Sequence, residues 1–285
     1  MIKIKFTKMN GAGNDFVMID KRDLGDYTLS AEEVISVCDR RRGIGSDGMI
    51  VIQPSQTADF EMIYYNSDGK PGSLCGNGAR CAVKFARQQG YFGNNLTNFE
   101  VGGKKFSGEY YNDNLMGFHT GPPEKIKLNF KIKAFGQLIT SHYANTGSPH
   151  VVIEIGNILE DPGKPDSGFT NLEKVPVLDI GKEIRYSRDF SPGGVNVNFI
   201  SRIGNDVFIR TYERGVENET LACGTGSIAA ALVLNSKYGI QSPVNLKTAG
   251  GDTLNVEFSN NAGTYSGINL TGPAKINFTG IFNII

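Results

Sequence analysis

The feature that most constrains this chain of 285 residues is a short motif that occurs once in each half. It reads CGNG at residues 75–78 and CGTG at residues 223–226, and an apolar stretch with the period of a helix follows each copy. A thiol at a helix start is favoured as the thiolate, because unpaired N–H groups and the helix dipole stabilise negative charge there. The motif therefore predicts two helix-start thiols, Cys75 and Cys223.

The repeat extends well beyond these two motifs. The segment GAGNDFVMID at 11–20 corresponds to NTGSPHVVIE at 145–154, and RRGIGSDGMIVI at 41–52 corresponds to SPGGVNVNFISRI at 191–203. A strand that ends in a polar turn precedes each cysteine, and a glycine pair that opens a hairpin follows each cysteine helix. Because the order is the same in both halves, we predict an α+β fold with two pseudo-symmetric domains. In each domain, curled β-sheet strands surround a central helix.

The end of the first repeat places the boundary between the domains near Gly121. We expect the N-terminal domain to comprise residues 1–121 and 270–285, because the last stretch of the chain returns to complete it. The C-terminal domain is then expected to comprise residues 122–269.

Composition argues against several classes of function. The chain has 29 basic and 29 acidic residues, so it lacks the charge expected of a protein that binds nucleic acid or an anionic membrane. It has no apolar run of the roughly 20 residues that span a bilayer, and its amino terminus lacks a signal peptide pattern. Four cysteines are too sparse for a secreted disulfide scaffold, and three scattered histidines lack metal-ligand spacing. We therefore expect a cytoplasmic protein without a metal site.

Two glycine-rich strings invite comparison with nucleotide-binding loops. GIGSDG at 43–48 fits the dinucleotide pattern, but it precedes a strand and follows a helical stretch, which is the reverse of the required context. GTGSIA at 224–229 does precede a helix, but the nearest strand ends well before it. No glycine turn is followed by the Lys-Ser/Thr pair of a phosphate loop. These contexts disfavour a nucleotide site.

Two symmetric thiols are suited to moving a proton from one face of a carbon to the other. One thiolate abstracts a proton while the opposing thiol delivers one. The backbone donors of both turns could bind a carboxylate beside that carbon, at Gly76, Asn77, Gly224 and Thr225. The alternatives are a covalent nucleophile, with His150 as the only suggestively placed base, and a redox dithiol, for which a C-x-x-C motif is missing. A purely structural alternative is a tight helix entry whose glycines supply positive φ.

The combined blocks resemble the diaminopimelate epimerase family. The resemblance covers essentially the whole chain, in family order, through GAGNDFV (11–17), GIG (43–45), NSDG (66–69), CGNGARC (75–81), PH (149–150), VN (195–196), ERG (213–215) and ETLACGTG (219–226). It implies a cofactor-independent, two-cysteine epimerase that interconverts LL- and meso-2,6-diaminopimelate, on the route to lysine and peptidoglycan, without pyridoxal phosphate. It also implies an active site between the two halves, a small-molecule substrate and a homodimer.

The resemblance assigns roles to single residues. Cys75 is similar in position to the family's proton donor and Cys223 to its proton acceptor, in the LL-to-meso direction. Substrate contacts are implied for Asn14, Asn66, Gly76, Asn77, Asn196, Glu213, Arg214, Gly224 and Thr225. His150 and Glu213 match groups that adjust the acidity of the thiols. Arg214 is suited to a bidentate grip on a second carboxylate.

Three positions depart from the family pattern. Many members have Asn at the place of Ser148 and Gln at the place of Gly48, and the loop at 217–219 is one residue longer than in some relatives. Serine lacks the amide donors of asparagine, so one substrate contact is expected to be lost or taken over by water. These departures leave open a related two-cysteine racemase of proline-like or histidine-like amino acids. An acyl transferase with a cysteine nucleophile and a binding protein without catalysis are the alternatives from other classes.

Overall fold

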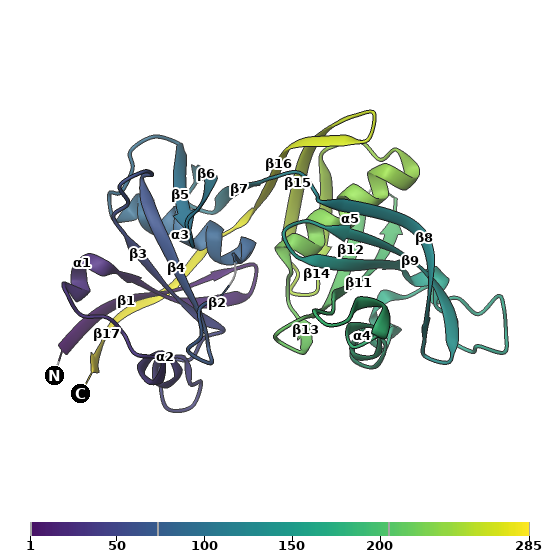
Figure 1. Ribbon diagram of the computed structural model, residues 1–285, viewed down its shortest axis with the longest axis horizontal. Helices are drawn as coiled ribbons and strands as arrows, with labels where there is room; N and C mark the ends of the chain where they lie inside the picture. The colour runs from purple at the N-terminus through teal and green to yellow at the C-terminus, as the bar shows by residue number, and fades with distance from the viewer. Residues whose placement is uncertain (1, 73, 205, 285) are drawn as a thin grey trace. The chain divides into compact units, whose positions relative to one another are not determined.

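The computed structural model describes residues 2–72, 74–204 and 206–284 (Figure 1). The chain forms two compact units. Unit 1 comprises the residues up to His119 together with those from Thr271 onward, and unit 2 comprises Thr120–Leu270. The chain leaves unit 1 along β7 (Leu115–Thr120) and returns along β16 (Thr264–Pro273). Among the described residues, no helix is both long and apolar enough to cross a lipid bilayer.

Unit 1 is built from strands that pair in the order β17, β1, β2, β3, β4, β5, β6 and β7. The pairs β2–β3 and β4–β5 are parallel, and the others are antiparallel. The remaining strand bounds are β1 (Ile2–Gly11), β2 (Asn14–Asp20), β3 (Gly48–Gln53), β4 (Phe60–Asn66), β5 (Leu96–Val101), β6 (Lys104–Asn112) and β17 (Lys275–Ile284). These strands curl around helix α3 (Gly76–Gln88) (Figure 1).

Unit 2 has strands that pair in the order β8, β9, β10, β11, β12, β14 and β15. The pairs β10–β11 and β12–β14 are parallel, and the others are antiparallel. The bounds are β8 (Lys125–Ala134), β9 (Gln137–Asn145), β10 (Pro149–Glu154), β11 (Asn196–Ile203), β12 (Asp206–Glu213), β14 (Val244–Thr248) and β15 (Thr253–Asn261). The short β13 (Asn218–Thr220) pairs with β12, and the strands surround α5 (Gly224–Tyr238).

The two units repeat one sequence of strand pairings. From β17 to β6 the pairs are antiparallel, antiparallel, parallel, antiparallel, parallel and antiparallel, and the same order runs from β8 to β15. The register repeats as well, because Phe16 lies opposite Gly48 in unit 1 and His150 lies opposite Asn196 in unit 2. The prediction of an α+β fold with two pseudo-symmetric parts is therefore confirmed.

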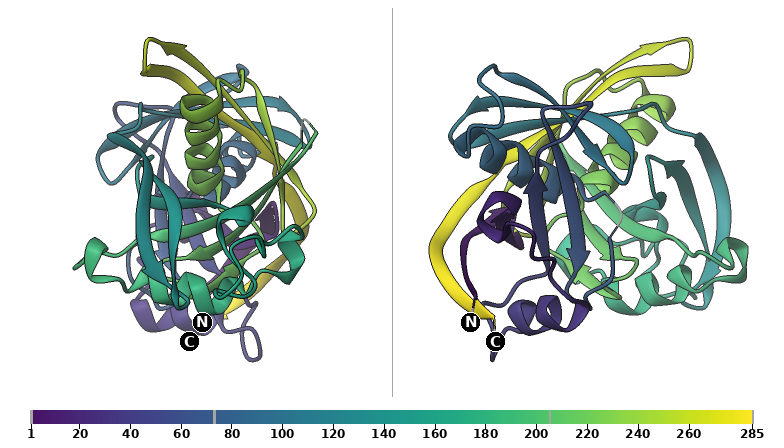
Figure 2. Two further views of the ribbon diagram at one scale, coloured as in Figure 1. Left: turned by 90° about the vertical axis from the view of Figure 1, so that its right-hand side faces the viewer. Right: turned by 60° about the vertical axis from the view of Figure 1, so that its left-hand side comes forward.

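The cysteine helices are the buried centre of each unit. The residues of α3 from Gly76 to Ala86 are buried, and most of α5 as far as Leu234 is buried too, as the left view of Figure 2 illustrates for α5 among its strands. A helix buried on all sides is apolar on all sides unless its polar groups have partners. Lys84 on α3 follows this rule, because its ammonium donates to the carbonyl of Ala274 at 3.0 Å.

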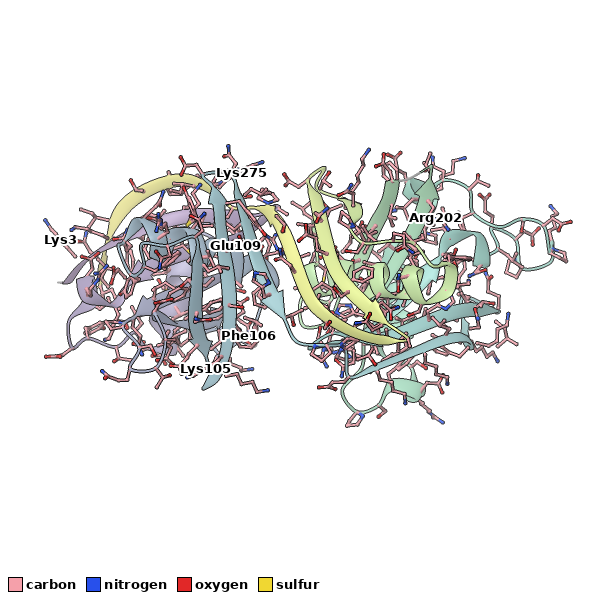
Figure 3. The ribbon with its side chains drawn as sticks, turned by 90° about the horizontal axis from the view of Figure 1, so that it is seen from above. Lys3, Lys105, Phe106, Glu109, Arg202 and Lys275 are labelled. Carbon is pink, nitrogen blue, oxygen red and sulfur yellow. The ribbon has the colours of Figure 1, made fainter. Side chains whose placement is uncertain are left out.

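Aromatic side chains fill the space between α3 and the strands of unit 1. Phe60 and Phe99 stack with ring centroids 5.2 Å apart, and Phe106 lies 5.9 Å from Phe99. Figure 3 labels Phe106 on β6 beside the exposed Lys105. Neighbouring side chains of a strand point to opposite faces, so this alternation holds the aromatic ring toward the core and the lysine in solvent.

Shorter helices pack against strands of both units. They are α1 (Lys21–Leu24), α2 (Ala31–Cys38), α4 (Val177–Arg185) and the 3₁₀ helices η1 (Ile155–Asn157), η2 (Leu172–Lys174) and η3 (Arg188–Phe190). Helices α1 and α2 lie on β3, and α4 lies on β11 and β12. The start of α2 is set by a capping box, in which Ser30 Oγ accepts from the Glu33 N–H and the Glu33 carboxylate accepts from the Ser30 N–H. Cys38 closes this helix as a buried thiol.

Candidate functional site

Cys75 caps the N-terminus of α3 and is half-buried. Its sulfur accepts from the Gly78 N–H at 3.5 Å, and its thiol donates to Asn14 Oδ1 at 3.4 Å. The backbone donor and the helix dipole favour a thiolate, whereas the Asn14 oxygen favours a protonated thiol. Cys75 thus has a partner for both of its protonation states.

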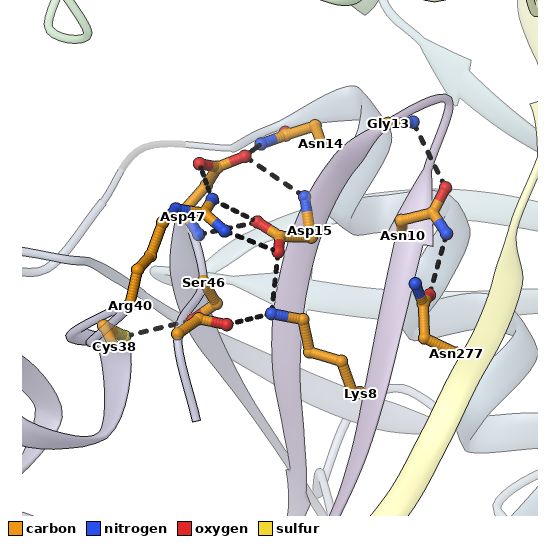
Figure 4. Close-up of polar contacts among 11 residues, drawn as sticks. Lys8, Asn10, Gly13, Asn14, Asp15, Cys38, Arg40, Ser46, Asp47 and Asn277 are labelled. Atoms are coloured by element: carbon orange, nitrogen blue, oxygen red, sulfur yellow. Dashed lines mark hydrogen bonds and ion pairs between the residues drawn. The ribbon is translucent and has the colours of Figure 1, made fainter. Parts of the chain in front are cut away.

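Asn14 is itself held by a network of charged groups, shown in Figure 4. Its amide nitrogen donates to Asp47 Oδ2 at 2.7 Å, which leaves the amide oxygen for Cys75. Arg40 donates to Asp47 at 2.7 Å and to Asp15 at 2.8 Å, and so joins the two carboxylates. Asp47 can only accept hydrogen bonds as a carboxylate, so this network decides which end of the Asn14 amide faces the sulfur.

Lys8 completes this network from inside the sheet of unit 1. Its buried ammonium lies 2.7 Å from Asp15 Oδ2 and donates to the Gly45 carbonyl. Burial raises the pKa of the Asp15 carboxyl, but the hydrogen bonds from Arg40 and Lys8 outweigh it and lower this pKa to about 2. The Asp15 carboxyl is therefore a carboxylate near neutral pH.

Two other asparagines of unit 1 that the sequence singles out occupy different settings. Asn77 is buried in the first turn of α3, where Arg80 donates to its Oδ1 at 2.8 Å. Asn66 is exposed at the end of β4, and its backbone closes a turn, since its carbonyl accepts from the Gly69 N–H at 2.9 Å. Gly76 is the first residue of α3 and is buried.

Cys223 caps the N-terminus of α5 in unit 2 and is 7% exposed. Its sulfur lies 3.6 Å from the hydroxyl of Thr225, and Gly224 is the first residue of the helix. His150 is fully buried, and its Nε2 lies 2.9 Å from both Thr225 Oγ1 and Ser148 Oγ. The structure thus brings Cys223, Thr225, His150 and the divergent Ser148 into one cluster.

His150 is a neutral imidazole in this cluster. Burial lowers the pKa of His150, the positive charge of Arg214 lowers it further, and the result is a pKa of about 3. Because it stays uncharged at neutral pH, His150 acts on its neighbours through one N–H donor and one acceptor nitrogen.

Asn196 and the end of β12 form the other part of the unit 2 cluster. Asn196 Nδ2 donates to the Pro149 carbonyl at 3.0 Å, and its Oδ1 accepts from the Arg214 N–H at 2.9 Å. Glu213 accepts from the Thr220 hydroxyl at 2.9 Å.

Arg214 lines a hollow of about 640 Å³ whose basic side chains are Lys125, Lys127 and Lys131 and whose aromatic ones are Phe130, Tyr143 and Phe190. Asp189 also lines it, so the lysines and Arg214 outnumber the acidic side chain and the hollow carries net positive charge.

Gly78 and Gly226 of the two cysteine motifs are needed for close packing, and the motif glycines are not among those with the positive φ that the structural alternative requires. Gly76 and Gly78 belong to α3, and Gly224 and Gly226 belong to α5. A Cβ on Gly226 would lie 2.2 Å from Asn198 Oδ1. Gly78 and Gly226 let each helix approach the strands beneath it, since a Cβ on Gly78 would lie 3.0 Å from Ile50 Cδ1.

Gly48, one of the positions that departs from the family pattern, also has a packing reason. A Cβ at this position would lie 2.6 Å from Cε2 of the Tyr64 ring. The backbone carbonyl oxygen of Tyr65 would lie 2.6 Å away as well, so a larger side chain requires both the ring and the neighbouring strand to move.

Several residues of these clusters were not predicted from the sequence. They include Lys8, Arg40 and Asp47 in unit 1, and Asn198 in unit 2, whose Nδ2 lies 3.1 Å from His150 Nδ1. Asp47 lies inside the glycine string that was compared with a dinucleotide motif. Asn198 lies two residues after Asn196 on the same face of β11 and is fully buried. A polar residue at an inward position of an apolar strand was the available signal for Asn198.

Comparison with known proteins relates the whole chain to one family. The family model described as diaminopimelate epimerase matches residues 6–126 and 142–276. The chain belongs to the diaminopimelate epimerase family. It is 39% identical to the diaminopimelate epimerase of Chlorobaculum tepidum over 281 residues, which cover 97% of this chain and 100% of the relative. It is 37% identical to that of Aquifex aeolicus over 267 residues, which cover 90% of both chains.

Solved structures extend the likeness in fold beyond the diaminopimelate epimerase family. A probable proline racemase from Agrobacterium radiobacter superposes with a TM-score of 0.72 at 14% identity, over 99% of this chain and 93% of that one. A phenazine biosynthesis protein of the PhzF family from Bacillus anthracis gives a TM-score of 0.71 at 14% identity, over 100% of both chains. At this identity the likeness shows a shared fold alone. Family membership makes this chain an isomerase, an amino-acid epimerase.

Proposed function

We propose that this member of the diaminopimelate epimerase family interconverts LL-2,6-diaminopimelate and meso-diaminopimelate with Cys75 and Cys223 as its acid and base, in lysine and peptidoglycan precursor biosynthesis. In the LL-to-meso direction the Cys223 thiolate takes the α-proton from the substrate and becomes a thiol. The Cys75 thiol gives its proton to the opposite face of the same carbon and becomes a thiolate. The reverse reaction exchanges the two roles, and the atoms balance without a cofactor.

The observation that carries this proposal is that both thiols lie at the N-termini of buried helices. Each thiol also has its own side-chain hydrogen-bond partner. Cys75 caps α3 beside Asn14, and Cys223 caps α5 beside Thr225. Helix N-termini stabilise the thiolate that acts as base. They also favour the carboxylate of an amino acid, whose charge increases as the α-proton leaves. Pseudo-symmetric thiols suit a reaction whose substrate and product differ only in handedness at one carbon.

The remaining residues are proposed to bind the substrate. The helix-start positions suited to the carboxylate at the reacting carbon are Gly76, Asn77, Gly224 and Thr225. Contacts to the rest of the substrate are proposed for Asn14, Asn66, Asn196, Glu213 and Arg214. Support for Arg214 comes from the basic hollow that it lines, since a second carboxylate is attracted by such a group of cations. His150 and Glu213 are proposed to adjust the acidity of the thiols.

The domain assignment, the homodimer and the cytoplasmic location expected from the family belong to the same proposal. Unit 1 and unit 2 would be the two epimerase domains. A homodimer is supported by the exposed apolar side chains Ile276, Phe278 and Ile281 on β17. Sedimentation equilibrium of the parent and of Ile281→Asp tests this part, because a charge on that strand should shift a dimer toward monomer.

The decisive experiment follows the α-proton of LL-diaminopimelate in D₂O with reduced protein and without pyridoxal phosphate. Proton NMR should show deuterium entering at the α-carbon, and chiral chromatography should show inversion at one centre only. Cys75→Ser and Cys223→Ser are compared with Cys81→Ser, which removes a buried thiol from the same helix as Cys75. Folded, reduced protein that exchanges no deuterium would contradict the proposed function.

Parallel incubations distinguish the rival functions. Proline and histidine should stay unexchanged, and their racemisation would favour a related racemase of another amino acid. A stable acyl-thioester on Cys75 or Cys223 in the mass spectrum would favour a transferase. Binding of diaminopimelate without exchange would favour a protein that only holds the substrate.

A further inference from the structure

A chain of buried polar side chains runs beneath the N-terminus of α5 in unit 2. Thr211 Oγ1 donates to Asn198 Oδ1 at 3.0 Å, and Asn198 Nδ2 lies 3.1 Å from His150 Nδ1. On its other side, His150 Nε2 lies 2.9 Å from Thr225 Oγ1, which lies 3.6 Å from Cys223 Sγ. Thr211 on β12, Asn198 on β11 and His150 on β10 are all buried. The chain therefore links neighbouring strands to the thiol.

The orientation of the Asn198 amide is fixed by its other partners. Asn198 Nδ2 donates to the Val151 carbonyl at 2.9 Å, and a carbonyl oxygen can only accept. The nitrogen end of the amide must therefore face β10, and its second hydrogen is available to His150 Nδ1. The oxygen end accepts from Thr211. If the amide were reversed, Asn198 Oδ1 would face the Val151 carbonyl oxygen, and neither atom could donate a hydrogen bond.

This orientation selects one tautomer of His150. Since Asn198 presents an N–H to Nδ1, that nitrogen must be the acceptor, and the proton of the neutral ring sits on Nε2. The Nε2–H then points toward Thr225 Oγ1 and Ser148 Oγ. The Ser148 hydroxyl also donates to Thr225 Oγ1, at 3.3 Å. Thr225 Oγ1 therefore receives hydrogen bonds, and its own proton is directed to Cys223 Sγ.

The corresponding positions of unit 1 are apolar. The repeated register places Phe16 where unit 2 has His150, and Ile50 where it has Asn198. Both are fully buried side chains beneath α3. Ile50 Cδ1 would lie 3.0 Å from a Cβ on Gly78, just as Asn198 Oδ1 would meet one on Gly226. The pseudo-symmetry is thus broken at the positions that support the two thiols.

We propose that Asn198, supported by Thr211, is a positioning residue that fixes the Nε2–H tautomer of His150, so that the Thr225 hydroxyl donates to the Cys223 thiolate. This inference rests on the proposed function, and it adds the reason why Cys223 is the thiol held as the base. A donor directed at sulfur stabilises the thiolate over the thiol. The Asn14 oxygen, in contrast, accepts from the thiol of Cys75.

The charged and titratable groups near this chain come from several elements. His150 lies on β10, Cys223 at the start of α5, and Glu213 and Arg214 at the end of β12. Arg214 acts on His150 through its positive charge, and Glu213 is engaged by the Thr220 hydroxyl. None of these groups has to change its protonation state for Asn198 to select the tautomer.

The first test reads the tautomer directly. Nitrogen-15 NMR of the histidine side chains is tractable because the chain has three histidines, and His150→Gln assigns the resonance. The parent should show His150 protonated at Nε2 only. Asn198→Leu, which keeps the approximate size but has no amide, should show a mixture of tautomers. A parent protonated at Nδ1, or a folded Asn198→Leu protein with an unchanged tautomer, would overturn the proposal.

The second test follows the effect on the thiol. Alkylation by iodoacetamide is measured against pH for each cysteine by peptide mass spectrometry, in the intact protein without substrate. Asn198→Leu should raise the pH midpoint of Cys223 alkylation by about one unit, which slows this alkylation about tenfold at pH values below both midpoints, and leave Cys75 unchanged. Ile50→Val, at the equivalent position of unit 1, should leave both unchanged. Equal changes at both cysteines, or none at Cys223, would contradict a positioning role.

Variants of Thr211 provide a test if Asn198→Leu fails to fold. Thr211→Val keeps the shape without the hydroxyl and should slow Cys223 alkylation about threefold, whereas Thr211→Ser keeps the hydroxyl and should match the parent. Equal alkylation rates of Cys223 in the folded Val and Ser variants would refute the proposed role of the hydrogen bonds from Thr211 through Asn198 to His150. Because alkylation and NMR need no diaminopimelate, a failure of the proposed epimerase function would leave these results independently interpretable.

Discussion

The amide oxygen of Asn14 lies 3.4 Å from the Cys75 sulfur because the amide nitrogen of the same side chain is held by Asp47 at 2.7 Å. Besides the Gly78 N–H, Cys75 therefore meets a fixed acceptor, while Cys223 meets the hydroxyl of Thr225. Two helix-start thiols that are equivalent in the repeat thus differ in the hydrogen bonds around them. This difference supports the proposal that Cys75 is the proton donor and Cys223 the proton acceptor in the LL-to-meso direction.

Replacing Asp47 by Ala should therefore reduce the activity that depends on Cys75, although Cys75 itself is unchanged. The Asn14 amide would be free to rotate, and we expect kcat/KM to fall about tenfold, the order of a lost hydrogen bond to a charged group. Asp59→Ala is the matched control, because Asp59 Oδ2 also accepts from one side chain, Thr97, and one backbone N–H, Asn98. Steady-state kinetics of both variants, with LL- and with meso-diaminopimelate as the substrate, would measure the change in kcat/KM. Equal losses in the two variants would point to a general effect on folding.

Replacing either helix-start cysteine should slow epimerisation much more strongly. Serine at position 75 or 223 is a far weaker acid than cysteine, so we expect losses of about 10²–10⁴-fold, the usual contribution of a general acid or base. The buried Cys38 and Cys81 are the internal comparison, and their Ser variants should keep near-parental rates once folded. Near-parental turnover by Cys75→Ser or Cys223→Ser would exclude the two-thiol mechanism.

The stability of unit 1 should depend on pH through Asp15. Burial raises the pKa of the Asp15 carboxyl, but hydrogen bonds from Arg40 and Lys8 prevail and bring it from its ordinary value of 3.8 down to about 2. A lowered carboxyl pKa stabilises the fold above the unfolded-state value, and this contribution is lost as the pH falls from about 4 to about 2. Asp15→Asn should therefore cost on the order of 2 kcal/mol at pH 7 and little at pH 2.

Chemical denaturation at a series of pH values measures this dependence. The free energy of unfolding of the parent should converge on that of Asp15→Asn at low pH. The exposed Asp26→Asn is the control, and its difference from the parent should be small throughout. A difference for Asp15→Asn that does not change between pH 7 and pH 2 would show that the carboxylate charge is not the cause.

Glycine at position 226 should be required because of Asn198. A Cβ on Gly226 would lie 2.2 Å from Asn198 Oδ1, so Gly226→Ala should lower the free energy of unfolding by about 1–3 kcal/mol, the usual cost of overpacking. Gly78→Ala should cost less, because its nearest contact at 3.0 Å is the mobile end of Ile50. The double variant Gly226→Ala, Asn198→Ser should regain part of the loss in thermal and chemical denaturation. Strictly additive losses would argue against this contact.

Several features of the fold could be predicted because they depend on local pattern. The helical period after each cysteine, the glycine pairs and the alternating strands are properties of neighbouring residues. The glycine pairs at 102–103 and 250–251 lie in the turns that join β5 to β6 and β14 to β15, so each pair marks a hairpin, at its turn and not ahead of it. The order of the repeated blocks then indicated two pseudo-symmetric parts, which the repeated strand pairing confirms.

The polar chain of unit 2 and the charged network of unit 1 could not be predicted in the same way. Asn198 and Thr211 are 13 residues apart, and they meet because β11 and β12 pair in a register that places them opposite each other. Asp47 and Asn14 are 33 residues apart and meet at the start of the parallel strands β2 and β3. Register is decided by packing across the whole sheet, which a single segment does not contain.

By itself, then, the sequence determined that two thiols, Cys75 and Cys223, begin two apolar helices in matching halves of the chain. The reason is that capping, periodicity and repeat order are written in consecutive residues. Only the tertiary structure decided how these thiols differ. It placed an amide oxygen fixed by Asp47 beside Cys75, and a hydroxyl supported by buried His150 beside Cys223. Hydrogen-bond direction depends on all the partners of a buried group, and those partners come from separate strands.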